Sequence, residues 1–297
     1  MRQIGVSTVA FKSKKEIEIF YKETGIPLEY SVNLLPDDIS YLLDIHIPCT
    51  SVHIPSPTRE FFPNFASANK TVFQKSIEIL KESMNTLFNC GGTTLVLHPG
   101  YATDFLIPSD YKLRKPFIEK GIERYKNYII DKNGAVTGRD YLLSEDYIRY
   151  FKIFSENILK VLEFVKTQGF LLAIENLNPR LYYILQTPQE IKDLSKLSPD
   201  IHFCLDFGHL YISSLTNKFN FLEGIREILD TNKVIHFHIS NNPSSPGYYD
   251  DAHDHIDRGK IEYSSLFPLI KETDANYILE IKYNPKEDIK ILKKYFK

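Results

Sequence analysis

Eight short apolar runs, each followed by a helix-like segment, constrain the fold of this chain more than any other feature. The runs begin at Ile4, Ile26, Thr50, Thr93, Phe170, Ile201, Val234 and Asn276. They are apolar on both faces, as strands of a parallel sheet covered by helices must be. Eight strand–helix units in 297 residues predict a single (β/α)8 barrel of the α/β class, the TIM-barrel architecture. An open, doubly wound sheet is the structural alternative.

One long segment interrupts the alternation. Residues 101–141 lie between the fourth apolar run and its helix, and they show no regular pattern. Loops of this length usually form lids, binding loops or small subdomains. We therefore expect an insertion or lid on the face where the strands end. No Pro/Gly/Ser-rich linker divides the chain, which predicts one domain over residues 1–297.

Composition excludes several classes of protein. The chain is 43% hydrophobic and 25% charged, typical of a globular domain. No apolar run is long enough to span a bilayer and no signal segment is evident, so we expect a cytoplasmic protein with no membrane partner. The three widely spaced cysteines indicate neither a disulfide framework nor a zinc ribbon. A net charge of −2 argues against a generally basic nucleic-acid binder.

Ionisable side chains gather where the predicted strands end. In a parallel barrel these ends meet at one mouth, which carries the active site. Charged groups there are costly unless they are paired or bound to a metal. Each residue alone is more often an ordinary hydrogen-bonded side chain, but the joint pattern predicts a site for divalent metal. Its candidate ligands are His53, His98, Glu175, Asp206, His209, His238, Asp251, His253 and Glu280.

The other histidines fit structural roles better. His202 starts its strand and should lie at the barrel floor, while His46 lies near a helix end. His236 points inward one layer below His238, which suits a supporting or core residue. His255 is expected to be solvated or to support a ligand.

Several motifs resemble those of the xylose-isomerase-like barrel superfamily. They are "SVHIP", "VLHPG", "AIENL", "CLDFGH", "HFHIS", "DAHDHIDRGKI" and "ILEIK". This superfamily includes sugar and sugar-phosphate isomerases and epimerases. It also includes endonuclease IV (AP endonuclease family 2), which cleaves DNA at abasic sites.

Resemblance to endonuclease IV implies a centre of three zinc ions. His53, His98 and Glu175 would hold one ion. Glu175 would bridge to a second ion, also held by Asp206, His238 and Glu280. The third ion would be held by His209, Asp251 and His253.

Resemblance to the isomerases and epimerases implies a smaller centre. Glu175, Asp206, His238 and Glu280 would hold one divalent ion, Zn²⁺ or Mn²⁺. Glu175 and Glu280 would then transfer protons at carbons beside a carbonyl, and His209 would position a substrate hydroxyl.

The chain departs from both patterns. Endonuclease IV enzymes typically carry "DTCH" and "HLND" where this chain has "DFGH" and "HISN", which puts specificity for abasic DNA in doubt. Many epimerases place an arginine where this chain has Ser244, so Arg180 or Arg258 is predicted to bind substrate instead. The basic stretches "KSKK" and "KLRK" fit ordinary solvated loops, and their functional alternative is contact with an anionic substrate. The stretch "RLYY" could pack a lid or stack on a sugar or a base.

The sequence therefore favours a metal-dependent isomerase or epimerase acting on a small sugar or sugar phosphate. The alternative is an endonuclease IV-like zinc phosphodiesterase acting on nucleic acid or another phosphoester. A non-catalytic metal-binding or interaction barrel is a third class. The pattern does not define an oligomeric state.

Overall fold

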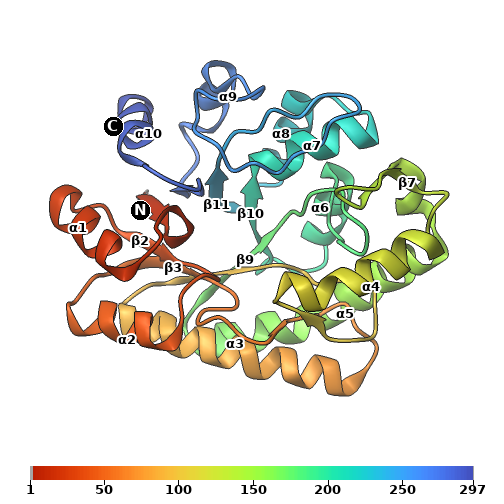
Figure 1. Ribbon diagram of the computed structural model, residues 1–297, viewed down its shortest axis with the longest axis horizontal. Coiled ribbons are helices and arrows are strands. Elements are labelled where there is room, and N and C mark those ends of the chain that lie inside the picture. The colour runs from red at the N-terminus through yellow and green to blue at the C-terminus, as the bar shows by residue number, and fades with distance from the viewer. Residues whose placement is uncertain (1–2, 297) are drawn as a thin grey trace.

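The computed structural model describes residues 3–296, in which eight parallel strands close into a barrel. Neighbouring strands follow chain order, and β1 closes the ring by pairing with β12, with Ile4 opposite Tyr277. The predicted (β/α)8 barrel is confirmed over the open sheet (Figure 1). The barrel strands are β1 (Ile4–Ser7), β2 (Leu28–Tyr30), β3 (Cys49–His53), β5 (Thr94–Leu97), β9 (Leu171–Glu175), β10 (His202–Asp206), β11 (Val234–Ile239) and β12 (Asn276–Leu279).

The expected helices surround this barrel, and local signals define their ends. Ser13 accepts a hydrogen bond from the backbone of Glu16 and caps the first helix, which ends at the left-handed Gly25. Thr187 and Glu190 form a reciprocal capping box at the start of the helix Pro188–Ser195. The helices are α1 (Lys14–Thr24), α2 (Pro36–Asp44), α3 (Lys70–Cys90), α5 (Glu145–Thr167), α6 (Pro188–Ser195), α8 (Phe221–Leu229), α9 (Tyr263–Ile270) and α10 (Lys286–Tyr295), with the 3-10 turn η1 (Thr8–Ala10) after β1.

One helix was missed in the sequence pattern. The sixth strand was expected to end at Asp206 and to be followed by a loop carrying His209; β10 does end at Asp206, but α7 (Phe207–Asn217) follows directly. The Asp206 carboxylate accepts a hydrogen bond from the backbone N–H of His209 at 2.6 Å and so caps the new helix. His209 therefore lies in the first turn of a helix, and its expected place in a loop was wrong.

The insertion is more regular than its sequence suggested. Residues Phe61–Phe62 (β4) pair with Ile107–Pro108 (β6), and Asp110 then caps α4 (Tyr111–Arg124) through the N–H groups of Lys112 and Leu113. A two-stranded hairpin, β7 (Ile129–Asp131) and β8 (Val136–Thr137), and the 3-10 helix η2 (Arg139–Leu143) complete it. In Figure 1 this part covers the right side of the barrel.

Backbone hydrogen bonds tie the insertion to the loop that follows β9. The N–H of Thr137 donates to the carbonyl of Pro179 at 2.8 Å, and the N–H of Leu181 donates to the carbonyl of Ala135 at 2.8 Å. On the other side of the loop, the N–H of Ala102 donates to the carbonyl of Tyr182 at 2.7 Å. The β9 loop is thus held between the two ends of the insertion, which fixes its course beside the barrel mouth.

A disulfide corrects the expectation drawn from the cysteines. Cys49 at the start of β3 is bonded to Cys90 at the end of α3, with Cα atoms 5.5 Å apart. The two are 41 residues apart in sequence. They meet because α3 packs back along β3 and its last turn returns to the strand's beginning. Cys204 is free and buried inside the barrel. None of the helices within residues 3–296 has the length and hydropathy of a membrane-spanning segment.

Asp104 is a polar anchor of the insertion and suits a stability test. Its carboxylate accepts hydrogen bonds from Ser67 Oγ at 3.0 Å, the Ala68 N–H at 2.7 Å and Tyr150 Oη at 2.9 Å. Burial tends to raise the pKa of Asp104, but these donors outweigh it and hold the pKa below its ordinary value. The resulting stabilisation is present above the unfolded-state pKa of about 3.9 and is lost as pH falls through the lower folded-state pKa.

Asp104→Asn should therefore lower the free energy of unfolding by about 1–2 kcal/mol at pH 7, because a charged acceptor is lost. The difference from wild type should be smaller at pH 3, which lies below the unfolded-state pKa of about 3.9, because part of the stabilisation is lost there. Urea denaturation at the two pH values measures both quantities. Asp140→Asn, at an exposed aspartate of the same insertion, is the control. An Asp104→Asn protein as stable as wild type at pH 7 would contradict the anchoring role.

Candidate metal centre

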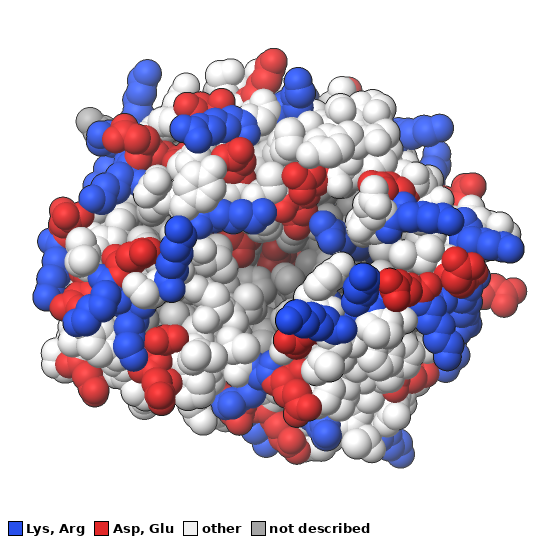
Figure 2. Space-filling view, viewed as in Figure 1, with Lys and Arg blue, Asp and Glu red and all other residues white. Residues whose placement is uncertain are grey.

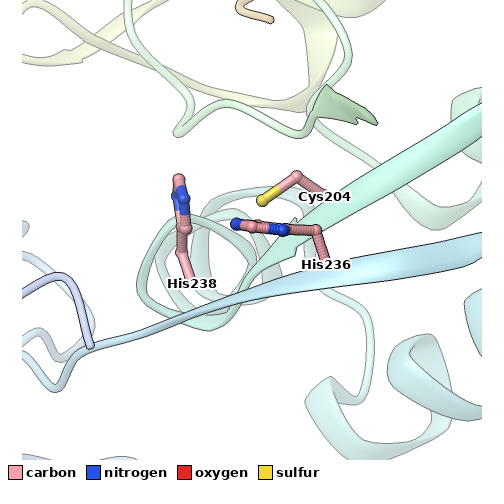
Figure 3. A group of neighbouring side chains, drawn as sticks. All are labelled: Cys204, His236 and His238. Atoms are coloured by element: carbon pink, nitrogen blue, oxygen red, sulfur yellow. The ribbon is translucent and has the colours of Figure 1, made fainter. Parts of the chain in front are cut away.

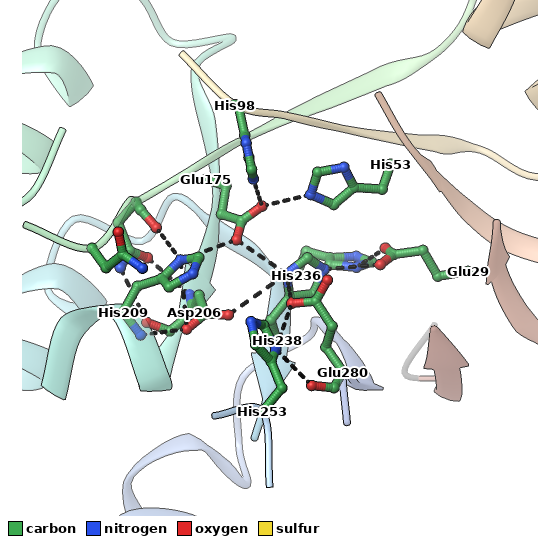
Figure 4. A network of polar contacts seen from close by, with 12 residues as sticks. Glu29, His53, His98, Glu175, Asp206, His209, His236, His238, His253 and Glu280 are labelled. Carbon is green, nitrogen blue, oxygen red and sulfur yellow. Dashed lines mark hydrogen bonds and ion pairs between the residues drawn. The ribbon is translucent and has the colours of Figure 1, made fainter. Parts of the chain in front are cut away.

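The predicted ligand residues converge on Glu175, the last residue of β9. Its Oε2 lies 2.9 Å from Nε2 of His53, which ends β3, and 3.2 Å from Nε2 of His98, which follows β5 (Figure 4). Its Oε1 lies 3.3 Å from Nδ1 of His209 and 3.3 Å from Nδ1 of His238. Four strands and helix α7 thus deliver one carboxylate and four imidazoles to a single point.

A second group shares Glu175. Asp206, His238 and Glu280 join it from β10, β11 and the end of β12, and one ligand atom from each of the four residues lies within 4.8 Å of the others. Glu280 Oε2 is 3.3 Å from His238 Nδ1. His53, Glu175 and His238 form an overlapping group by the same measure.

A third group stands beside the first two. His209 Nε2 is 3.4 Å from Asp251 Oδ2, and His253 Nε2 is 3.4 Å from Asp251 Oδ1. Asn178 Nδ2 donates to Asp251 Oδ2 at 2.8 Å and orients the carboxylate. Both Asp251 and His253 come from the acidic loop after β11, as the sequence predicted. All nine predicted ligand residues therefore meet at one mouth.

Burial makes these charges interdependent. Glu175 and Asp206 are fully buried, and burial alone raises a carboxyl pKa. For Glu175 the surrounding imidazoles, His238 first, outweigh burial and hold the pKa well below its ordinary value. For Asp206, burial outweighs the nearby His209, the charges of Glu175 and Glu280 add to burial, and the pKa rises to about 6. The protonation states of these carboxylates and imidazoles are therefore coupled.

Unpartnered atoms test whether a cation fits. Glu175 Oε1, Asp206 Oδ2 and His238 Nδ1 are buried and have no hydrogen-bond partner within residues 3–296. All three belong to the four-residue group, and such orphaned atoms need an explanation. A divalent ion would satisfy them together. The mixture of imidazole and carboxylate ligands suits zinc or manganese.

Glu29 on β2 was missed as a supporting residue, although a charge inside the apolar run "IPLEY" was a signal. Its carboxylate is fully buried and lies 3.0 Å from His238 Nε2 and 2.9 Å from His236 Nε2. Ser51 Oγ donates to it at 2.8 Å. The contact with Glu29 orients the His238 ring so that Nδ1 faces Glu175 and Glu280.

Cys204 lies beside this pair of histidines. Figure 3 shows its thiol directed toward His236 and His238, and one ligand atom of each of the three lies within 4.8 Å of the others. His238 Nε2 and His236 Nε2 are already directed at Glu29. Burial also raises the pKa of the Cys204 thiol, which keeps it protonated. We therefore assign Cys204 and His236 to the support beneath the metal groups, where they lie beside the ligand residue His238.

The remaining histidines lie outside the metal groups. His255 is buried, not solvated, and its Nδ1 lies 2.6 Å from Asp288 Oδ2. His202 begins β10 at the opposite end of the barrel from the metal groups, as predicted. His46 has a left-handed backbone just after α2.

A cavity of about 220 Å³ opens above the ligands. Figure 2 shows a hollow near the middle of this face, with acidic side chains inside and basic ones at its rim. Arg180, Phe62 and Tyr183 line the cavity together with several of the ligands. Arg180 lines the cavity, and its role in substrate binding stays a prediction. Arg258 is exposed and lies outside the cavity lining.

Fold and site together define a class: a (β/α)8 barrel protein with clustered metal-ligand residues at the carboxyl ends of its strands. The particular family follows from comparison with known proteins. The chain belongs to the xylose isomerase-like TIM barrel family, which matches residues 16–296. This family includes sugar epimerases and endonuclease IV, so the predicted resemblance is confirmed.

Individual relatives fall on both sides of that division. A probable endonuclease 4 of Aster yellows witches'-broom phytoplasma is 26% identical, over 70% of this chain and 73% of that protein. The crystal structure of a D-tagatose 3-epimerase-like protein matches with a TM-score of 0.69 at 20% identity, covering 99% of this chain and 96% of that one. The zinc-bound IOLI protein matches with a TM-score of 0.66 at 14% identity, covering 99% and 96%. At these identities the two structures establish the fold alone.

Glu29→Gln should weaken metal binding about 10–100-fold, as loss of a supporting partner typically does. A glutamine side chain has one acceptor oxygen, so one of His236 and His238 loses its partner. Competition with a chromophoric chelator measures the affinity. Ser51→Ala, which removes only a donor to Glu29, is the matched control and should have a smaller effect. Wild-type affinity in Glu29→Gln would show that the carboxylate does not position His238.

Proposed function

We propose that this protein hydrolyses a phosphoester at a centre of three divalent metal ions, most suitably zinc. The sequence favoured an isomerase or epimerase, with phosphoester hydrolysis as its alternative. One observation favours hydrolysis: the group formed by His209, Asp251 and His253 is fully assembled beside the group that shares Glu175. A sugar isomerase needs only the four-residue group.

The third group has no evident structural purpose. Asp251 lies between two imidazoles, and although burial tends to raise its pKa, His253 and His209 hold it well below its ordinary value. The loop that carries it contributes no strand to the barrel. Charged groups buried in this way cost stability unless they serve a site. Their alignment with the ligand set implied by endonuclease IV supports the same role.

The chain's own residues would prepare the substrate for in-line attack. Glu175 lies between the ligand groups, so it can fix the distance between the metal ions that these groups would hold. Phe62 and Tyr183 wall the cavity and exclude water around the phosphorus. When bound, the metal ions supply an activated water and neutralise charge on the phosphate and the leaving oxygen.

Epimerisation remains a second candidate because of one feature. The Glu175 and Glu280 carboxylates each lie 3.3 Å from the same atom, His238 Nδ1, and both line the open cavity. They could therefore flank a substrate carbon bound between them, with His209 beside its hydroxyl.

Metal stoichiometry is the first test. Protein purified without added metal should contain three divalent ions per chain by elemental analysis. Asp251→Asn should contain two, because it removes the carboxylate that lies between His209 and His253. Asp257→Asn, an exposed aspartate of the same loop, should retain three. A single ion in the wild-type protein would favour the epimerase instead.

Activity assays separate the two reactions. Wild-type protein should cleave a phosphodiester such as bis(p-nitrophenyl) phosphate, and Asp251→Asn should be slower by about 100-fold. An abasic duplex tests nucleic acid as the substrate. Exchange of a carbon-bound proton of a ketose with deuterated water, without phosphoester cleavage, would overturn the proposal in favour of epimerisation. Glu280→Gln should abolish whichever activity is present.

A further inference from the structure

A second cavity of about 120 Å³ lies beside the metal cavity, and we call it the side pocket. It is enclosed by α4, the β7–β8 turn and the loop after β9, and it shares two residues with the metal cavity, Arg180 and Tyr183. One water molecule needs only about 10–15 Å³. The side pocket can therefore hold a group much larger than water, joined to whatever occupies the metal cavity.

The walls of the side pocket are mainly aromatic. Tyr101 and Tyr183 form its inner side, where their ring centroids are 5.4 Å apart. Tyr111 and Phe117 of α4 form its outer side and remain 61% and 39% exposed. Aromatic rings left accessible around a concave site are suited to stacking on a planar group.

Arg180 lies between the two cavities, and its positive charge is unpaired within residues 3–296. Its guanidinium makes no hydrogen bond or ion pair with any other residue that the structure describes. Arg114, the other arginine of the side pocket, is engaged: its Nη1 donates to the carbonyls of Pro108 at 2.7 Å and Ser109 at 2.8 Å. Arg180 is therefore the cation available to an anionic ligand, and its planar fork suits a phosphate.

The backbone of this loop is strained next to Arg180. Tyr182 has φ 71°, a conformation that is rare for an aromatic residue. It is held by hydrogen bonds at both ends of the residue: the Tyr182 N–H donates to Tyr141 Oη, and the Tyr182 carbonyl accepts from the Ala102 N–H. Such outliers persist where surrounding structure holds them, often at binding sites. The insertion thus holds Arg180 and Tyr183 at the boundary of the cavities.

We propose that the side pocket binds the nucleobase of a nucleotide whose phosphate is held by Arg180 and reacts in the metal cavity. This inference rests on the proposed phosphoester hydrolysis and narrows its substrate class to small nucleotides with an intact base. The base stacks among Tyr101, Phe117 and Tyr183, while the sugar spans the boundary. The insertion is then a specificity element, since it supplies the outer wall.

Binding measurements with three probes test the assignment. Adenosine 5′-monophosphate, ribose 5-phosphate and adenosine are titrated into the as-purified protein by isothermal calorimetry. The nucleotide should bind about tenfold more tightly than ribose 5-phosphate, because base stacking on aromatic side chains adds to the phosphate contact. Equal affinities for these two probes would overturn the proposal.

Matched variants locate the two contacts. Phe117→Ala should reduce nucleotide affinity about fivefold or more and leave ribose 5-phosphate unchanged. Leu113→Ala, at a 59% exposed residue of the same helix outside the pocket, should change neither. Arg180→Gln should weaken both phosphorylated probes about tenfold or more and spare adenosine. Arg139→Gln, at an exposed arginine of the insertion outside both cavities, is its control, and an equal loss there would show a general charge effect instead of a site.

These experiments distinguish a failure of the binding proposal from a failure of the proposed reaction. A protein that shows the expected probe pattern but cleaves no phosphoester would refute the proposed reaction and leave the side pocket assigned. A protein that cleaves phosphodiesters but binds ribose 5-phosphate as tightly as the nucleotide would refute the side pocket alone.

Discussion

Burial of the Glu175 carboxylate is the interaction on which the rest of this site depends. A charge at the end of a buried strand has lost its water, and four imidazoles replace that water on its two oxygens. Those imidazoles come from separate parts of the chain, so the carboxylate can be satisfied only if the barrel closes in the observed register. A divalent cation would complete the arrangement, because buried oxygen and nitrogen atoms of the four-residue group have no hydrogen-bond partner within residues 3–296. Folding and metal binding are therefore expected to be coupled at this point.

Two parts of the protein shape this site: the buried residues beneath the ligands and the insertion beside them. Glu29 lies one layer deeper in the barrel and directs His238 toward the metal groups, so ligand geometry depends on a residue that never reaches the cavity. The insertion shapes the cavity from the side. Its hydrogen bonds to the β9 loop place Arg180 and Tyr183 at the edge of the cavity, where they bear on the choice of substrate. Barrel proteins commonly keep their metal chemistry on the strands and vary specificity through such loops.

Much of the site could be predicted because parallel strands put their carboxyl ends at one mouth. His53 and Glu175 could be placed there from the position of each in an apolar run, and the structure brings them within 2.9 Å. The prediction failed just after Asp206, where a loop was expected. Asp206 caps helix α7, and the apolar residues that follow it do not show a helical pattern in the sequence. The Cys49–Cys90 bond was missed for a different reason: sequence spacing does not show that α3 folds back along β3.

The sequence alone determined the strand–helix alternation, the closed barrel and the set of ligand residues, because period, chain direction and residue chemistry are local properties. The three-dimensional structure decided how the ligands divide into three groups, which oxygen of Glu175 each imidazole meets, and that Glu29 supports His238. It also decided that the insertion encloses a second pocket and that the Arg180 guanidinium has no hydrogen bond or ion pair within residues 3–296. These properties depend on distances between segments far apart in the chain, and such distances exist only once the barrel has closed.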